Sequence, residues 1–206
     1  MNHGKIIAVV GGPRSGKSFL VSRIAEYYKG IAILEGEESD FPPRIKEDIQ
    51  ENIRPLERII WFRNKLVNEY LKAIKKKEEG HTVITDNFWI SYQLYIDALA
   101  NDFEGELIND IARIDRKTLL WPDVIILLTL SEEGVRDFIK RGGRQFDQTE
   151  EFIQKQALPV HKLHEDFFNR NEMQRNVLII QRDELDFEKQ EDLHSLIEKI
   201  EGLGRK

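Results

Sequence analysis

Gly11-Gly-Pro-Arg-Ser-Gly-Lys-Ser18 is the stretch that decides the fold. It has two glycines five positions apart, followed directly by Lys and Ser, which is the spacing of a phosphate-binding loop. The apolar run 5–10 precedes it and predicts a buried strand, and residues 18–28 place apolar side chains at helical spacing. A strand, a glycine loop and a helix in this order predict backbone N–H groups that surround phosphate oxygens at a helix N-terminus. The stretch therefore predicts a site for a nucleoside triphosphate, whereas the alternative is an ordinary glycine turn.

The loop also predicts how the triphosphate is held. Lys17 is expected to reach the β- and γ-phosphates, and the Ser18 hydroxyl is expected to ligate Mg²⁺. The expected cofactors are ATP, as phosphate donor, and Mg²⁺. The residues expected to bind them are Gly11, Gly12, Pro13, Arg14, Ser15, Gly16, Lys17 and Ser18.

Bulk properties exclude several classes of protein. The 206 residues suit a single α/β domain over 1–206, and the net charge of −6 argues against binding nucleic acid through its backbone. No apolar run approaches the ~20 residues that span a membrane, and the first expected strand starts too early to leave room for a signal peptide. Without cysteine, disulfides and thiol chemistry are excluded. We expect a cytoplasmic protein that binds neither nucleic acid nor membrane.

Five short apolar runs alternate with helical patterns along the chain. This alternation predicts a three-layer fold: a five-stranded parallel sheet with helices on both faces. Ligands of such sheets gather at the carboxyl ends of the strands, so the residues after each run are site candidates. The longest helical pattern covers about 54–79. The five runs are 5–10, 31–34, 82–85, 124–130 and 176–180.

Two carboxylates stand at expected strand ends. Asp86 is a candidate to hold Mg²⁺ through water opposite Ser18; the alternative is a cap for the helix that follows. Glu35 is a candidate to accept the proton of an attacking hydroxyl during phosphoryl transfer. Because Glu37 and Glu38 follow closely, a hydrated acidic loop explains Glu35 equally well.

Arginines and aromatic residues supply further candidates. Basic residues around Gly142-Gly143, with Arg141 and Arg144 on either side, are typical of a hinged lid at about 140–149 that closes over a triphosphate. The alternative is a basic helix C-terminus. Aromatic side chains near 88–95, with Trp61, form either a wall for a planar base or plain core. His161 and His164 are interpreted as surface or packing residues.

Taken together, these motifs resemble the deoxynucleoside kinase family, in particular its bacterial deoxyadenosine/deoxyguanosine branch. The resemblance covers nearly the whole chain. It is carried by the glycine loop, by 33–38, where the family has its catalytic glutamate, by 83–89, by the Pro-Asp strand at 121–128, by the lid and by the last strand at 177–187.

The resemblance implies roles for individual residues. Glu35 inherits the general-base role, with Glu37 as the fallback, and Arg182 and Asp183 border the base of the phosphate donor. The family reads the acceptor base with a glutamine on the long helix, where this chain carries Glu57 or Arg63. The resemblance also implies a homodimer packed through long helices, with 54–79 as a candidate. The expected substrate-binding residues are Glu37, Glu57, Trp61, Arg63, Asp86 and Phe88, and the expected catalytic residues are Lys17, Glu35, Arg141 and Arg144.

The resulting prediction is a P-loop kinase that moves the γ-phosphoryl group of ATP to the 5′-hydroxyl of a deoxynucleoside. One alternative is a nucleoside monophosphate kinase of the thymidylate kinase type, which needs extra cations for the acceptor's phosphate; Arg44, Arg54 or Arg63 are candidates for these. A second alternative is a nucleotide-binding regulatory protein.

Overall fold

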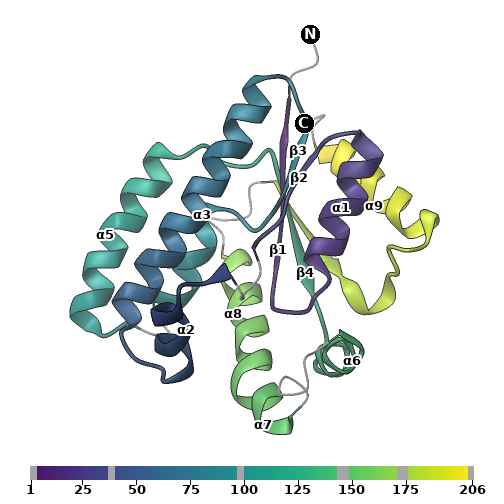
Figure 1. Cartoon of the computed structure of the whole chain (residues 1–206). Helices are drawn as coiled ribbons and strands as arrows, with labels where there is room; N and C mark the ends of the chain where they lie inside the picture. Colours follow the sequence, from purple (N-terminus) through teal and green to yellow (C-terminus); the bar gives the residue numbers. More distant parts are fainter. Residues whose placement is uncertain (1–3, 37–39, 97–99, 143–148, 171–175, 204–206) are drawn as a thin grey trace.

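A computed structural model describes residues 4–36, 40–96, 100–142, 149–170 and 176–203. The described strands form a five-stranded sheet in the order β2-β3-β1-β4-β5, and every neighbouring pair is parallel. This confirms the predicted fold class: a parallel sheet between two layers of helices (Figure 1). The strands are β1 (Ile6–Gly11), β2 (Ile31–Ile33), β3 (Val83–Asp86), β4 (Val124–Thr129) and β5 (Val177–Gln181).

The central strands are apolar on both faces because helices cover both sides. Every residue of β1 and β4 is buried. Such continuous apolar runs are typical of parallel sheets that are covered on both faces. The register pairs Val9 with Asp86 and Gly11 with Leu128. It therefore brings the ends of β3 and β4 beside the start of the glycine loop.

One face of the sheet is covered by α1 (Lys17–Tyr28) and α9 (Gln190–Leu203). Leu20 and Ile24 of α1 and Leu196 and Ile200 of α9 pack with Ile7 of β1 in one buried cluster. These apolar residues recur at intervals of four, which gives each helix one buried stripe. Helix α1 is thereby held rigidly at the carboxyl end of β1, with its N-terminus at the glycine loop.

The other face carries α3 (Pro55–Glu78), α8 (Leu158–Phe168) and the 3₁₀ helix η2 (Trp89–Tyr95). Their buried cluster is rich in aromatic rings, including those of Tyr70, Trp89 and Phe168. Helix α5 (Asp102–Thr118) lies outside α3, and α2 (Pro43–Gln50) packs at the start of α3 (Figure 1). This face therefore has an extra helical layer beside the sheet's carboxyl edge.

The remaining described elements follow β4 and β5. They are α6 (Glu132–Gly142), the short α7 (Glu150–Phe152), the π-helical turn η4 (Ile153–Ala157) and the 3₁₀ turn η6 (Arg182–Glu184). The expected lid at 140–149 lies largely outside the described residues, as do Arg144 and Glu37. Among the described helices, none combines the length and apolar character needed to cross a membrane.

Candidate functional site

The glycine loop has the backbone geometry of a phosphate cradle. Gly11 and Gly16 both have positive φ, +151° and +85°, and Gly16 is the N-cap of α1. A Cβ at Gly11 would lie 2.7 Å from the carbonyl oxygen of Leu128, so only glycine fits beside β4. Lys17 is the first residue of α1, and its Nζ donates to the carbonyl oxygen of Gly12 at 3.1 Å. The lysine is thus folded back over the loop, at the place where phosphates bind to such a helix N-terminus.

Ser18 and Asp86 meet at the end of β3. The Ser18 hydroxyl donates to Oδ2 of Asp86 at 2.5 Å, while Oδ1 of Asp86 is buried without a hydrogen-bond partner among the described residues. A buried carboxylate oxygen left unpaired beside a loop hydroxyl fits the oxygen ligands that Mg²⁺ takes in P-loop sites. These two residues therefore suit the metal ion that the glycine loop implies.

Glu35 follows β2 and lies across from the loop. Its Oε2 accepts a hydrogen bond from Nδ2 of Asn87 at 2.6 Å, and Asn87 is held at φ +66° directly after Asp86. Burial raises the pKa of Glu35 above its ordinary value, Lys17 opposes that rise, and the charge of Asp86 adds to it. Glu35 is therefore a partly buried, oriented carboxylate with a raised affinity for a proton.

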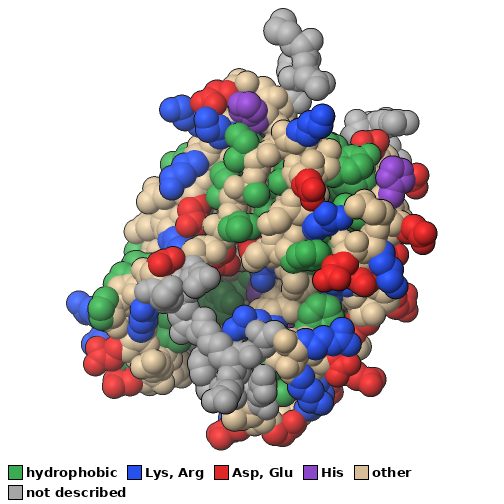
Figure 2. Space-filling view, turned by 45° about the vertical axis from the view of Figure 1, so that its right-hand side comes forward, with side chains coloured by type: hydrophobic (Ala, Val, Ile, Leu, Met, Phe, Trp, Pro, Cys, Tyr) green, Lys and Arg blue, Asp and Glu red, His purple; other side chains and the backbone are tan. Residues whose placement is uncertain are grey.

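Two cavities meet at Lys17. One, of about 370 Å³, is lined by Lys17, Glu35 and Asn87 together with side chains of α2, α3 and η2. The other, of about 750 Å³, is lined by Lys17, Ser18 and residues of α6 and η6. We call them the acceptor cavity and the donor cavity. Figure 2 shows a hollow with hydrophobic side chains in its floor and basic side chains at its rim.

The acceptor cavity is walled mainly by apolar and aromatic side chains. Tyr95 lies in it beside Glu35, and burial followed by the charge of Glu35 raises the pKa of Tyr95 to about 12. His164 also lines it, and burial lowers the pKa of His164 to about 3, so its imidazole is neutral. Its further apolar lining residues are Ile49, Ile59, Phe62, Leu66 and Tyr92.

His161 of α8 supports the glycine loop directly. Its Nε2 lies 2.8 Å from the carbonyl oxygen of Pro13, and because a carbonyl can only accept, Nε2 is the protonated nitrogen. A Cβ at Gly12 would lie 2.5 Å from atoms of the same ring. His161 and His164 are buried, as packing residues are, but no pattern in the sequence indicates that His161 packs on the loop.

The donor cavity is bordered by Arg182, Asp183 and Arg141. The Arg182 guanidinium lies over the rings of Phe138 and Phe187, and burial lowers its pKa. Asp183 accepts from the backbone N–H and the hydroxyl of Ser131, so it fixes the turn between β4 and α6. Arg141 is largely exposed.

Comparison with known proteins agrees with this architecture. The family model described as "AAA domain" matches residues 6–170, which include the glycine loop, Glu35 and Asp86. The chain belongs to this AAA domain family. No curated protein matches the sequence of this AAA domain.

Several solved structures share the fold of this AAA domain at low sequence identity. Deoxyadenosine kinase from M. mycoides with dCMP and dCDP bound has a TM-score of 0.71 at 16% identity, covering 96% of this chain and 99% of that one. Thymidylate kinase from Candida albicans has a TM-score of 0.66 at 19% identity, covering 97% and 92%. NadR protein in complex with NR has a TM-score of 0.63 at 18% identity, covering 99% and 53%. This AAA domain therefore has the P-loop kinase fold.

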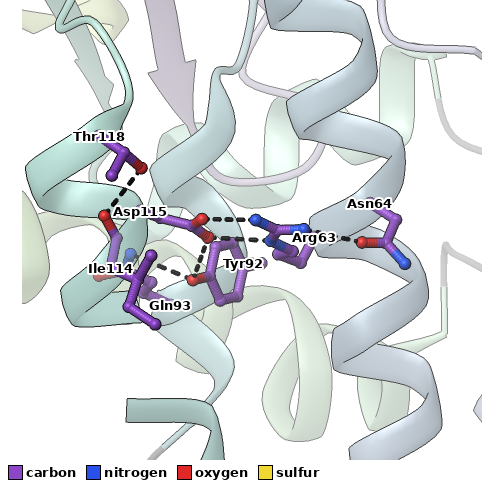
Figure 3. Close-up of polar contacts among 7 residues, drawn as sticks. All are labelled: Arg63, Asn64, Tyr92, Gln93, Ile114, Asp115 and Thr118. Atoms are coloured by element: carbon purple, nitrogen blue, oxygen red, sulfur yellow. Dashed lines mark hydrogen bonds and ion pairs between the residues drawn. The ribbon is translucent and has the colours of Figure 1, made fainter. Parts of the chain in front are cut away.

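Arg63, an expected substrate-binding residue, does not line the acceptor cavity of this AAA domain. Its guanidinium donates to both carboxylate oxygens of buried Asp115 on α5, at 2.9 and 2.5 Å (Figure 3). The hydroxyl of Tyr92 donates to the same carboxylate at 2.8 Å. Arg63 thus joins α3 to α5 behind the cavity wall, where Asp115 needs a cationic partner because it is buried.

Three other expected substrate-binding residues of this AAA domain also lie away from the cavity lining. Phe88 is 1% exposed and packs among Tyr70, Trp89 and Phe168 in the core, because its side chain points to the sheet's helical layer. Trp61 packs edge-on against Phe62, which itself lines the cavity. Glu57 is exposed in the first turn of α3. The structure therefore does not bring Phe88, Trp61 or Glu57 into the lining of the acceptor cavity, and their expected roles stay predictions.

Arg58 is the residue of this AAA domain that sequence reasoning missed. It is 6% exposed on α3 and lines the acceptor cavity. One terminal nitrogen donates to Oδ1 of Asn52 at 3.1 Å, while the buried Nε has no hydrogen-bond partner among the described residues. The only available signal was its spacing: Arg58, Phe62 and Leu66 recur every four residues and so share one stripe of the helix.

Proposed function

We propose that this protein transfers the γ-phosphoryl group of ATP to the 5′-hydroxyl of a deoxynucleoside. The observation that carries the proposal is that Lys17 lines two separate cavities, one on each side of the glycine loop. A hydrolase needs one site for its nucleotide, whereas a transferase needs a second site for the acceptor. The carboxylate of Glu35 and the ammonium group of Lys17 both belong to the lining of that second site.

The chemistry then divides among named residues. Backbone N–H groups of Gly12 and of residues 14–18, together with the Lys17 ammonium group, hold the β- and γ-phosphates. Ser18 and Asp86 would hold Mg²⁺, which would neutralise phosphate charge. Glu35 takes the proton of the attacking hydroxyl as its oxygen bonds to the γ-phosphorus and the bond to the β-phosphate oxygen breaks. Asn87 donates a hydrogen bond to one carboxylate oxygen of Glu35 and so orients the other oxygen toward the attacking hydroxyl. Arg141 and Arg144 close over the phosphates, and Arg182 borders the base of ATP.

The test is consumption of ATP with Mg²⁺ against a panel of deoxynucleosides, ribonucleosides and nucleoside monophosphates, with Lys17→Ala as the blank. We expect turnover with one or a few deoxynucleosides. Binding of ATP without transfer to any acceptor would contradict the proposal and support a nucleotide-binding regulatory protein instead.

A nucleoside monophosphate kinase is the second candidate, and Arg58 is the observation that favours it. Such an enzyme must hold the phosphate of its acceptor, and Arg58 places a guanidinium in the acceptor cavity. Arg54 and Arg63 are already paired, with Asp48 and Asp115 respectively. Turnover restricted to monophosphates in the same panel would establish this candidate in place of the first.

We also propose that two copies of the chain associate through α5. Three apolar residues at intervals of four and seven along this helix are exposed: Phe103 by 78%, Leu107 by 47% and Ile114 by 59%. Helix α5 is the outermost helix on its side of the fold (Figure 1), so a second copy can reach this stripe. We expect a homodimer by light scattering and a monomer for Leu107→Glu with Ile114→Glu. A monomeric wild-type chain at micromolar concentration would contradict this proposal.

A further inference from the structure

Arg58 is a fixed cation in an apolar cavity. A guanidinium stays protonated in proteins, offers five N–H donors and accepts no hydrogen bond. Around it the acceptor cavity is lined by Ile49, Ile59 and Phe62. Of the donors, one is used by Asn52, and the buried Nε–H has no partner among the described residues. An unpaired buried donor costs free energy, and a ligand that accepts a hydrogen bond from Arg58 recovers it.

No ion pair joins Arg58 to a carboxylate among the described residues, although its charge, after those of Arg54 and Arg44, helps to hold the pKa of Asp48 below its ordinary value. Asp48 is the buried acid of this region, and it is paired with Arg54. Glu35 lines the same cavity but accepts its hydrogen bond from Asn87. The guanidinium of Arg58 is therefore held in place by the fold and remains available to an acceptor molecule.

Resting on the proposed function, we propose that Arg58 selects the acceptor: it favours a base with two adjacent hydrogen-bond acceptors, the O6 and N7 edge of a 6-oxopurine, over adenine. Guanidinium pairs bidentately with this edge of guanine. Adenine places an amino donor at position 6, which opposes the N–H groups of Arg58. A cationic base such as that of nicotinamide riboside is disfavoured by charge.

The apolar wall distinguishes a base edge from a phosphate as the partner of Arg58. A phosphate keeps its hydration and is usually held by several cations, whereas among the described lining residues Lys17 is the only other cationic side chain, because His164 is neutral. Flat apolar and aromatic surfaces such as those of Phe62 and Tyr92 suit a planar ring. The cavity volume of about 370 Å³ also lies within the range of small-molecule sites.

The experiment is calorimetric titration of the full chain, loaded with a non-hydrolysable ATP analogue, with five probes. These are deoxyguanosine, deoxyinosine, 7-deazadeoxyguanosine, deoxyadenosine and deoxyguanosine monophosphate. We expect the two 6-oxopurine nucleosides to bind about 10- to 100-fold more tightly than deoxyadenosine. We expect 7-deazadeoxyguanosine, which lacks N7, to bind about tenfold more weakly than deoxyguanosine. This comparison needs no protein variant.

Two variants of Arg58 and one control complete the test. Arg58→Met should remove the preference, and Arg58→Gln, which both donates and accepts, should shift it toward deoxyadenosine. Lys72→Met removes one positive charge from the exposed face of the same helix and should leave the preference unchanged. Equal wild-type binding of deoxyadenosine and deoxyguanosine, or indifference to N7, would overturn the inference.

Other outcomes separate this inference from the proposed function. If Arg58→Met weakens only the monophosphate, Arg58 reads a phosphate and the base assignment is overturned. If deoxyguanosine binds through Arg58 but is never phosphorylated, the assignment of Arg58 stands and the kinase activity fails. If deoxyguanosine is phosphorylated but Arg58→Met keeps the wild-type ratio of kcat/KM for deoxyguanosine over deoxyadenosine, the kinase activity stands and the assignment of Arg58 fails.

Discussion

At the scale of single residues, Glu35 carries the sharpest pH dependence. A general base acts only when it is deprotonated, and burial raises the pKa of this carboxyl above 4.5. We therefore expect kcat/KM to fall on the acid side with an apparent pKa higher than that of an ordinary glutamate. Glu35→Gln should lower kcat about 10²- to 10⁴-fold and remove that acid limb. Activity of Glu35→Gln equal to wild type would refute the base assignment.

The same shift makes a prediction about stability. A raised carboxyl pKa means that the folded chain binds this proton more tightly than the unfolded chain. Its contribution to stability is complete below the unfolded value near 4.5 and is lost as pH rises through the folded value. Glu35→Gln should thus be more stable than wild type at neutral pH, with the difference shrinking toward pH 4. Chemical denaturation at several pH values measures the free energy of unfolding of wild type and of Glu35→Gln. Glu26→Gln, on the surface, is the control.

Gly12 and His161 make a second test at this scale. Gly12→Ala would place a Cβ 2.5 Å from the His161 ring, so either the loop or α8 must move. We expect ATP binding to weaken by at least tenfold, because loop geometry sets the phosphate contacts. Gly12→Ala combined with His161→Ala should bind ATP better than Gly12→Ala alone. Additive losses in the double variant would show that the ring does not constrain the loop.

Individual site residues differed in how far the sequence could predict them. The glycine loop depends on local backbone conformation, and its residues are contiguous, so the pattern predicts it directly. Which residues of α3 line the acceptor cavity depends on which side of the helix faces it. Arg58 and Arg63 are five positions apart, which places them about 140° apart around the helix. Sequence spacing alone does not say which direction faces the ligand, so Arg63 was expected there and Arg58 was overlooked.

At the scale of elements, the buried pair of Arg63 and Asp115 joins α3 to α5. Arg63→Met leaves Asp115, which is 1% exposed, without its cation. We expect the free energy of unfolding to fall by roughly 3–5 kcal/mol, as is typical when one partner of a buried pair is removed. Asp115→Asn should cost less, because a neutral amide still accepts from Tyr92. Urea unfolding measures both; an effect of Arg63→Met below 1 kcal/mol would mean that the pair is effectively solvated.

Element positions were predictable where the apolar pattern is strong. The five strands were expected within one or two residues of their observed bounds because their apolar runs are continuous, and every residue of β1, β3 and β4 is buried. The segment after β3 was not predictable in the same way. Aromatic residues there suit both a ligand wall and a core, and η2 uses them for both: Trp89 enters the core while Tyr92 and Tyr95 line the cavity. A 3₁₀ helix divides its side chains among three directions, which composition does not show.

At the scale of the whole molecule, the arrangement of two cavities around Lys17 predicts how ligands stabilise the chain. In the proposed function, ATP occupies the donor cavity, which is lined by residues of α1, α6 and η6, and the acceptor occupies the cavity lined by α2, α3 and η2. A molecule that joins a nucleoside to adenosine through a chain of phosphates fills both cavities and holds both groups of helices together. ATP at 100 times its Kd should stabilise the fold by about 2.7 kcal/mol. The bisubstrate molecule at equal concentration should raise Tm further, and Lys17→Ala should diminish both shifts. Equal Tm shifts for ATP and the bisubstrate molecule would mean that the acceptor cavity takes no part in binding, and the transferase proposal would then lose its structural basis.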